Sequence, residues 1–333
     1  GDKFKGDVST WSDIIAVNAG GMTAVGLKSD GTVVAEGDNG CGQCNVIGWT
    51  DIVAISSGQL HTVGLKCDGT VVCTALTDSR FNYGQCDIEE WTDIVAISTY
   101  RSHTVGLKSD GTVVITENPL GMKNPDFRGP DLSEWSDIVA IDKGIGTVIG
   151  LKSDGTVVAA GSNEELVKGV QNWSNIVAVA AAGSDTGSGG HLLGLREDGT
   201  VAVVGNNQYG ECNVGNWTDI FAVAGGTNFS LGLKIDGTVA ATGCTWYNSC
   251  NVSDWTDIKF PSAISHAERN VANDSRPAKG IVTMGLNIRA EASTDSKVVG
   301  QYNQGDEISI LWESGNWGRT EKGWVLLKYV DMK

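Results

Sequence analysis

Histidine is the side chain here with the broadest catalytic chemistry, and three of the four histidines recur at one position of a repeated pattern. That position holds His61, His103 and His191 in three copies and Thr23, Thr147 and Phe229 in the others. Nucleophilic catalysis needs a unique arrangement in which a base activates a nucleophile. Because no Ser-His-Asp or Cys-His pairing stands out, we expect these histidines to form structural hydrogen bonds within their own repeats.

The 8 cysteines could be thiols, disulfides or metal ligands. Four of them share one repeat position, a small buried site whose default state is a free thiol: Cys44, Cys86, Cys212 and Cys250. Cys41 with Cys44, or Cys244 with Cys250, could pair in an oxidising compartment. A zinc site would need a second Cys-x-x-Cys, which the sequence lacks. We expect buried thiols first, local disulfides second, and no metal or other cofactor.

Aspartate and tryptophan recur in the same regular way. Asp-Gly-Thr occurs six times, at Asp30, Asp68, Asp110, Asp154, Asp198 and Asp236. A Trp-[Ser/Thr]-[Asp/Asn]-Ile motif begins at Trp11, Trp49, Trp91, Trp135, Trp173, Trp217 and Trp255. Asp-Gly between strands is a turn signal and is a weak metal signal. We expect the aspartates to form turns and the tryptophans to pack between repeats rather than bind sugar.

The elements that carry these residues are short β-strands. In each copy, alternating β-branched runs flank Asp-Gly, which predicts a two-residue hairpin with positive φ at both turn positions. A Cys-Asn-Val run predicts a short fourth, outer strand. Four antiparallel strands in about 40 residues are typical of one propeller blade. Six copies in residues 1–260 predict an all-β, six-bladed propeller, and copy-like segments at both ends leave seven blades as the alternative.

The copies resemble a known repeat family. His-Thr-Val-Gly-Leu-Lys-Ser-Asp-Gly-Thr-Val-Val at 103–114, with Gly-Gln-Cys in other copies, is similar to the compact bacterial form of the regulator of chromosome condensation repeats. The eukaryotic member is a nucleotide exchange factor that binds chromatin, but the shorter repeats and acidic surface here do not fit that role. A secreted inhibitor of β-lactamases uses a similar propeller, so the resemblance implies protein binding.

Charge separates the propeller from the remainder of the chain. The formal net charge is -16, from 24 basic and 40 acidic residues. Residues 1–260 hold 15 basic and 31 acidic side chains, whereas residues 261–333 hold 9 of each. An acidic propeller would be repelled by nucleic acid and by anionic membranes. No apolar run in the sequence is long enough to span a bilayer. We therefore expect no nucleic-acid partner and no membrane insertion.

Residues 261–279 are polar, contain two prolines and read as a linker. Strand signals return in residues 280–333, where motifs at Leu286, Gly305, Trp317, Gly323 and Tyr329 resemble a bacterial Src-homology-3 domain, a small β-barrel. In that family such domains commonly hold secreted proteins on peptidoglycan or its peptide. The resemblance therefore implies a secreted or wall-associated bacterial protein.

The same resemblance gives candidates for the wall-ligand groove: Asn287, Trp317 and Tyr329. A core role for the two aromatic residues is the alternative. Because an anionic wall would repel the acidic propeller, we expect the neutral tail to be the part that meets the wall.

Three insertions interrupt the regular repeat spacing, at 74–85, 116–131 and 180–190. The loops after the first and third strands of an antiparallel sheet emerge at the same end, so all three should decorate one face of the propeller. Aromatic residues, Met and Arg are typical of protein-binding hot spots. The candidates are Arg80, Phe81, Tyr83, Tyr100, Arg101, Met122, Lys123, Phe127 and Arg128. Packing of the loops by their own side chains is the alternative.

Together these features predict a non-enzymatic, extracellular protein-binding propeller that its C-terminal domain anchors to the bacterial cell wall. One alternative is a proteinaceous inhibitor of a cell-wall enzyme or a β-lactamase. A second alternative is a glycan-active enzyme, but no unrepeated carboxylate pair supports it.

Overall fold

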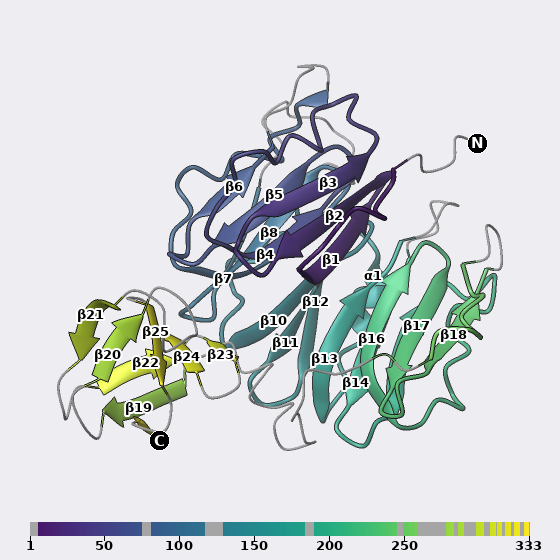
Figure 1. The fold of residues 1–333 in the computed structure, drawn as a ribbon. Coiled ribbons are helices and arrows are strands. Elements are labelled where there is room, and N and C mark those ends of the chain that lie inside the picture. Colours follow the sequence, from purple (N-terminus) through teal and green to yellow (C-terminus); the bar gives the residue numbers. More distant parts are fainter. Residues whose placement is uncertain are drawn as a thin grey trace. The chain divides into compact units, whose positions relative to one another are not determined.

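The computed structural model (Figure 1) describes residues 6–74, 81–116, 129–183, 190–244, 249–256 and 258, together with the backbone of the strands between 278 and 332. The chain divides into two compact units, Gly1–Asn273 and Asp274–Lys333. Each unit is described by itself. No helix in the described residues is long and apolar enough to cross a membrane.

The first unit contains six three-stranded antiparallel sheets, each formed by one sequence copy. We call these sheets blades one to six. The strands are β1 (Ile14–Gly20), β2 (Thr23–Lys28), β3 (Val33–Gly37); β4 (Ile52–Ser57), β5 (Thr62–Lys66), β6 (Val71–Cys73); β7 (Ile94–Tyr100), β8 (His103–Lys108), β9 (Val113–Ile115); β10 (Ile138–Lys143), β11 (Thr147–Lys152), β12 (Val157–Gly161); β13 (Ile176–Ala181), β14 (His191–Arg196), β15 (Val201–Gly205); β16 (Ile220–Gly226), β17 (Phe229–Lys234) and β18 (Val239–Gly243). The prediction of an all-β chain with a six-bladed propeller is confirmed.

The predicted fourth strand is wrong where the structure describes it. The Cys44–Val46 run forms a tight turn, in which the Val46 N–H donates to the Cys44 carbonyl at 2.8 Å and the Trp49 N–H donates to the Val46 carbonyl at 3.1 Å. These local bonds replace a ladder to the third strand. In blade four the corresponding connection contains the short helix α1 (Glu164–Gly169), which Asn163 caps through its side chain.

The Asp-Gly turns also differ from the prediction in one respect. Gly31 has a φ of 79°, but the φ of Asp30 is not positive. The Gly31 N–H donates to Lys28 O, and the Asp30 carboxylate accepts from the Thr32 N–H at 2.9 Å and its hydroxyl at 2.6 Å. These hydrogen bonds, the hydroxyl first, hold the pKa of Asp30 below its usual value. The aspartate therefore orders a longer turn, and its oxygens are used in doing so.

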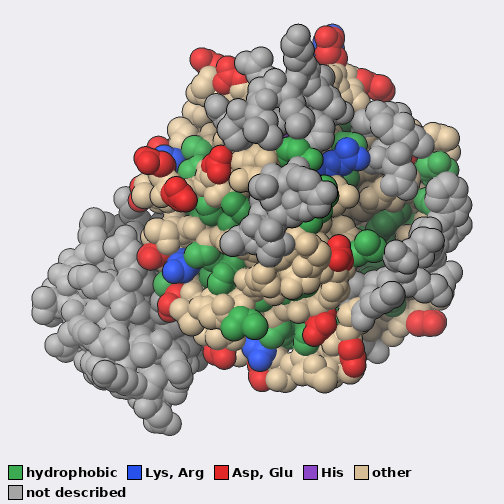
Figure 2. All heavy atoms as spheres, turned by 90° about the horizontal axis from the view of Figure 1, so that it is seen from above, with side chains coloured by type: hydrophobic (Ala, Val, Ile, Leu, Met, Phe, Trp, Pro, Cys, Tyr) green, Lys and Arg blue, Asp and Glu red, His purple; other side chains and the backbone are tan. Residues whose placement is uncertain are grey.

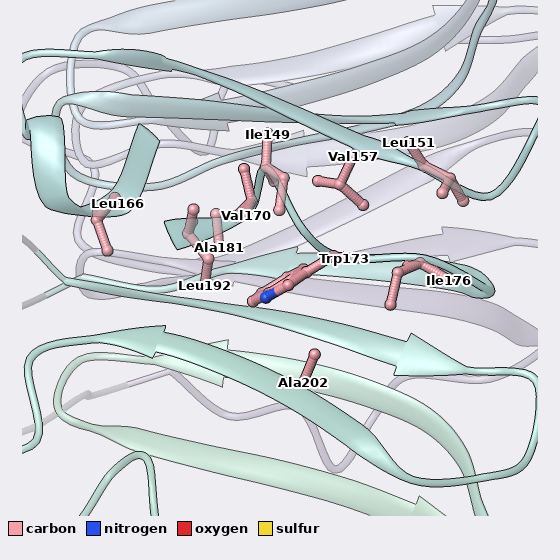
Figure 3. Packing of buried hydrophobic residues seen from close by; sticks show 10 residues of the cluster. All are labelled: Ile149, Leu151, Val157, Leu166, Val170, Trp173, Ile176, Ala181, Leu192 and Ala202. Atoms are coloured by element: carbon pink, nitrogen blue, oxygen red, sulfur yellow. The ribbon is translucent and has the colours of Figure 1, made fainter. Parts of the chain in front are cut away.

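Hydrophobic cores lie between neighbouring blades. One cluster joins Ile149, Leu151 and Val157 of blade four to Ile176 and Leu192 of blade five. Figure 3 shows the Trp173 ring among these side chains. A Cβ on Gly194 would lie only 2.7 Å from that ring, so glycine in the second strand allows the tryptophan to lie flat against the sheet.

The second unit is built from eight described strands in two sheets. The first sheet has the order β22-β19-β26 and the second the order β21-β20-β25-β24-β23. The strands are β19 (Ala278–Val282), β20 (Leu286–Arg289), β21 (Val298–Tyr302), β22 (Glu307–Ile310), β23 (Trp312–Ser314), β24 (Trp317–Thr320), β25 (Gly323–Leu326) and β26 (Val330–Met332).

Candidate protein-binding face

The strand register places the inserted loops on one face. In blade one the start of the second strand pairs with the end of the third, Thr23 with Gly37. The turn before Thr23 and the chain leaving Gly37 therefore lie at the same end of the sheet. We call this end, in all six blades, the insertion-bearing face. The Asp-Gly turns lie at the opposite end.

Blades two and three end their third strands early, and threonine makes this possible. The Thr74 Oγ1 accepts the Thr62 N–H at 3.0 Å, and the Thr116 Oγ1 accepts the Thr104 N–H at 3.0 Å. In blade one the second strand pairs two residues further, with Glu36 and Gly37. A hydroxyl thus replaces the missing ladder partner at the point where each inserted segment departs.

A disulfide closes the first insertion. Cys73, at the end of β6, is bonded to Cys86, and their Cα atoms are 5.7 Å apart, within the range that disulfides require. The expectation of a free thiol at Cys86 is therefore wrong, because the shortened third strand brings Cys73 beside it. The two cysteine pairs suggested by the sequence are not formed: Cys41, Cys44, Cys244 and Cys250 are thiols.

The chain returning from the first insertion is held by Gln85, which is fully buried. The Gln85 amide donates to the Phe81 carbonyl at 2.8 Å and its Oε1 accepts the Tyr83 N–H at 2.7 Å. The Gln85 carbonyl in turn accepts the hydroxyl of Thr104 in blade three at 2.7 Å. These bonds fix Phe81, 37% exposed, and half-buried Tyr83 at the junction of blades two and three.

Tyr100 and Arg101 lie at the same junction, Tyr100 as the last residue of β7 and Arg101 in the turn to β8. Arg101 adopts a left-handed φ of 51°, and its carbonyl accepts the Gln59 N–H of blade two at 3.4 Å. The Tyr100 hydroxyl lies directly against Gly183, in the corresponding turn of blade five. The structure thus places four candidates, Phe81, Tyr83, Tyr100 and Arg101, on the insertion-bearing face.

The remaining candidates from the sequence lie outside the described residues. They are Arg80, Met122, Lys123, Phe127 and Arg128.

His61 and His191 are structural, but their Nε2 atoms bond across blades and not within their own repeats, which corrects the sequence expectation for these two residues. The His61 Nε2 lies 3.0 Å from the Thr104 Oγ1 in blade three, and the His191 Nε2 lies 2.7 Å from the Ser230 Oγ in blade six. Burial lowers the pKa of His61 to about 3, with a smaller contribution from His103, and lowers that of His191 to about 4. Both imidazoles are neutral at physiological pH.

Sequence reasoning missed a second set of bonds between blades, which runs along the first strands. Asn18, Ser56, Ser98 and Asp142 occupy one repeat position, and each side chain accepts a backbone N–H of the next blade at 2.8–3.0 Å. Burial raises the pKa of Asp142, while three hydrogen bonds oppose that shift. The sequence did contain a signal for these bonds: four copies have a polar residue at the repeat position where the other two have Ala180 and Ala224.

The described surface is acidic and contains no group of three or more His, Cys, Asp or Glu side chains able to hold a metal ion. Figure 2 shows many Asp and Glu side chains of the described part along the edge of one face. Among the thiols, burial and the neighbouring Glu211 and Glu165 raise the pKa of Cys212 to about 12. That thiol is unreactive at neutral pH.

In the second unit, the groove candidates lie on one sheet. Asn287 is in β20 and Trp317 is in β24, and both strands pair with β25. Tyr329 lies outside the described residues.

The tail also matches a family model, that of the bacterial SH3 domain, over residues 285–331. The C-terminal unit contains a bacterial SH3 domain. The chain matches no curated protein.

For the propeller, solved structures supply the comparison. The chain is similar to yeast RCC1 (Prp20), crystallised with Kap60, at 17% identity and a TM-score of 0.52, covering 70% of each chain. It is also similar to the CRINKLY WD40 ectodomain of the Arabidopsis thaliana receptor kinase ACR4, at 19% identity and a TM-score of 0.52, covering 70% of this chain and 81% of that one. These likenesses establish an RCC1-like propeller fold.

Proposed function

We propose that the protein is a non-enzymatic binding protein of the bacterial cell surface. Its insertion-bearing face captures another protein, and its SH3 domain holds it on peptidoglycan or the peptide of peptidoglycan. The observation that carries the proposal is the junction of blades two and three, where the bonds of Gln85 hold Phe81 and Tyr83 beside Tyr100 and Arg101. Aromatic residues and Arg on a fixed support are typical of interface hot spots.

Two observations support a location outside the cell. The Cys73–Cys86 disulfide fits an oxidising compartment, and bacterial SH3 domains are associated with cell-wall binding. The charge distribution agrees with wall attachment through the tail, since residues 1–260 carry the whole net charge of -16 and would be repelled by an anionic wall. The same charge disfavours nucleic acid as a partner.

Sedimentation with purified sacculi tests the anchoring half of the proposal. The full chain should pellet with sacculi, and the chain lacking residues 261–333 should stay in solution. Equal pelleting of the shortened chain would show that the propeller, and not the SH3 domain, meets the wall.

Affinity capture from the native culture tests the binding half. Phe81→Ala with Tyr83→Ala should weaken capture of a partner, whereas Tyr209→Ala should not. Tyr209 is the matched control because its N–H is held by Glu211 in blade five as that of Tyr83 is held by Gln85. A large loss of thermal stability in the Phe81/Tyr83 variant would instead indicate that these rings pack their own loop.

A further inference from the structure

Exposed apolar side chains of the propeller are concentrated in its first and last copies. Of the large hydrophobic residues that are exposed in the described part, seven lie in these two copies or the segments that flank them and are counted in the site: Val8, Ile15, Val17, Met22, Ile235, Trp255 and Ile258. The other two are Phe81, near the first insertion, and Ile47, which lies in the turn after Cys44 and is not counted. A concentration of this kind marks an interaction site more often than a free surface.

Blade one provides the first wall of this site. The first strands of successive blades pack against one another, β1 on β4 and so on to β13 on β16, but no comparable packing joins β16 to β1 among the described strands. Val17 in β1 is 71% exposed, whereas Ile55 and Ile97, at the same repeat position, are half-buried against the preceding blade. Among the described strands, none packs on this face of blade one as the preceding blade does elsewhere.

Blade six provides the second wall. Leu231 and Leu233 in β17 are only half-buried, although Val105 and Leu107 at the same positions of blade three are fully buried. Trp255 is 51% exposed, in contrast to the buried tryptophans of the two preceding copies. Figure 1 shows β1–β3 and β16–β18 at the two ends of a curved array, and we call the interval between these two end sheets the opening.

The interfaces inside the propeller indicate what fits these walls. Val25 and Leu27 of one second strand pack with Ile52 and Ile55 of the next first strand. By the same pattern, the first strand of an occupying sheet would pack on Leu231 and Leu233. Its second strand would pack on Val17. An occupant needs aliphatic side chains on both faces. It also needs two paired strands, because a lone buried strand would leave its backbone polar groups unsatisfied.

The charge of the two copies that form the walls indicates which side chains the ends of the occupant carry. In the described residues, the first copy and the segment before it contain one basic side chain, Lys28. They contain five acidic ones: Asp7, Asp13, Asp30, Glu36 and Asp38. The described part of the last copy contains one basic side chain, Lys234, and three acidic ones: Asp219, Asp236 and Asp254. Both copies are therefore net acidic, and an acidic surface attracts a segment with basic flanks.

We propose that the opening between blades one and six docks a partner protein through a β-hairpin with aliphatic side chains on both faces and Lys or Arg at its ends. This site is separate from the insertion-bearing face, and its occupant would pack face to face between two blades, as the propeller's own sheets do.

A synthetic peptide with the sequence of residues 49–66, extended by two lysines at each end, is the probe, because that segment forms β4 and β5 between two blades. Its binding to the full-length protein is measured by fluorescence anisotropy. Val17→Asp should weaken binding at least about tenfold, because the carboxylate would be desolvated against leucine. Ile47→Asp is the control, since Ile47 is 98% exposed in the same copy but lies in the turn after Cys44.

Two peptide variants sharpen the measurement. Serine in place of Ile52, Ile55 and Val63 should abolish binding, and Glu in place of the flanking lysines should weaken it in a salt-dependent way. Three outcomes overturn the proposal: no binding of the lysine-flanked peptide, binding only after deletion of residues 259–277, and self-association of the full chain that Val17→Asp abolishes. The second outcome would assign the opening to the chain's own segment, and the third to a second copy.

Discussion

The Nε2 atom of His61 in blade two lies 3.0 Å from the Oγ1 atom of Thr104 in blade three, and both side chains are fully buried. The Thr104 hydroxyl donates its proton to the Gln85 carbonyl at 2.7 Å, so the imidazole is the donor to Thr104. One hydroxyl therefore joins two blades and the base of the first insertion.

Replacing Thr104 by Val should lower the free energy of unfolding by about 1–3 kcal/mol, because it leaves a buried N–H and a buried carbonyl without partners. Thr104→Ser should retain most of the stability, since it keeps the hydroxyl. Urea denaturation measures the difference. Thr50→Val, at an exposed threonine, is the control and should change little. A loss below about 0.5 kcal/mol for Thr104→Val, within the range of ordinary surface substitutions, would contradict the linking role.

Acidification below about pH 6.5 should destabilise the propeller through two of its buried histidines. The pKa values of His61 and His191 are lowered to about 3 and about 4, while an unfolded histidine titrates near 6.5. Protonation therefore favours the unfolded chain, and the stability present above pH 6.5 is lost as the pH falls toward 4. Each histidine should cost about 2 kcal/mol between pH 7 and pH 5.

Urea midpoints across that pH range test this dependence. His61→Asn with His191→Asn should be less stable at pH 7 but should show a flatter profile between pH 7 and pH 5. A slope equal to that of the wild type would assign the effect to other groups. The turn aspartates act in a separate window, because their lowered pKa values place their loss of stability below their usual value of 3.8.

Repetition is the reason that the fold could be predicted from the sequence. The same strand and turn signals occur in six copies, so the ambiguity of any one copy matters little. The packing of a tryptophan ring against a strand glycine also recurs from copy to copy. The fourth strand was predicted wrongly because Cys-Asn-Val has strand composition, while the chain there closes local turn bonds at Val46 and Trp49 in place of a ladder. Interactions between blades, such as His61 with Thr104, need the spatial order of copies and have no local signal.

The disulfide was missed for a related reason. The sequence places Cys86 in a column of thiols, and only the early end of β6 at Cys73 brings a second sulfur beside it. The candidate face could be predicted as far as its topology, since loop lengths fix which end of each blade is decorated. Its geometry depends on Gln85 and Gly183, which look unremarkable in the sequence.

Gly106 should not tolerate a side chain, because a Cβ would lie 2.8 Å from the ring of Trp91. Gly106→Ala should cost about 1–3 kcal/mol through overpacking, as measured by thermal or urea unfolding. Gly215→Ala is the matched control, since nothing lies within 4 Å of its Cβ position. Similar losses at both positions would show that backbone flexibility, and not contact with the tryptophan, decides the cost.

Breaking the Cys73–Cys86 bond should destabilise blade two. The double variant Cys73→Ser and Cys86→Ser should lose about 3 kcal/mol of stability, since a loop of this length gains about that much from closure. Cys67→Ser, at a free and half-buried thiol, should change little. Under denaturing, non-reducing conditions six thiols should react with maleimide, and eight should react after reduction. Labelling of all eight before reduction would contradict the assignment.

The contact between Tyr100 and Gly183 makes the candidate face sensitive to a residue two blades away. The Tyr100 hydroxyl lies where a Cβ on Gly183 would project, so Gly183→Ala must displace the ring and should cost about 1–3 kcal/mol. Because Tyr100→Ala removes the obstruction, Gly183→Ala should cost little when added to that variant, and the double-mutant cycle should show a coupling of about 1 kcal/mol or more. Urea denaturation of the four proteins measures the coupling, and partner capture reports the displaced ring independently. Additive losses would mean that Gly183 is required by its own backbone, and Tyr100 would then be free to move without affecting blade five.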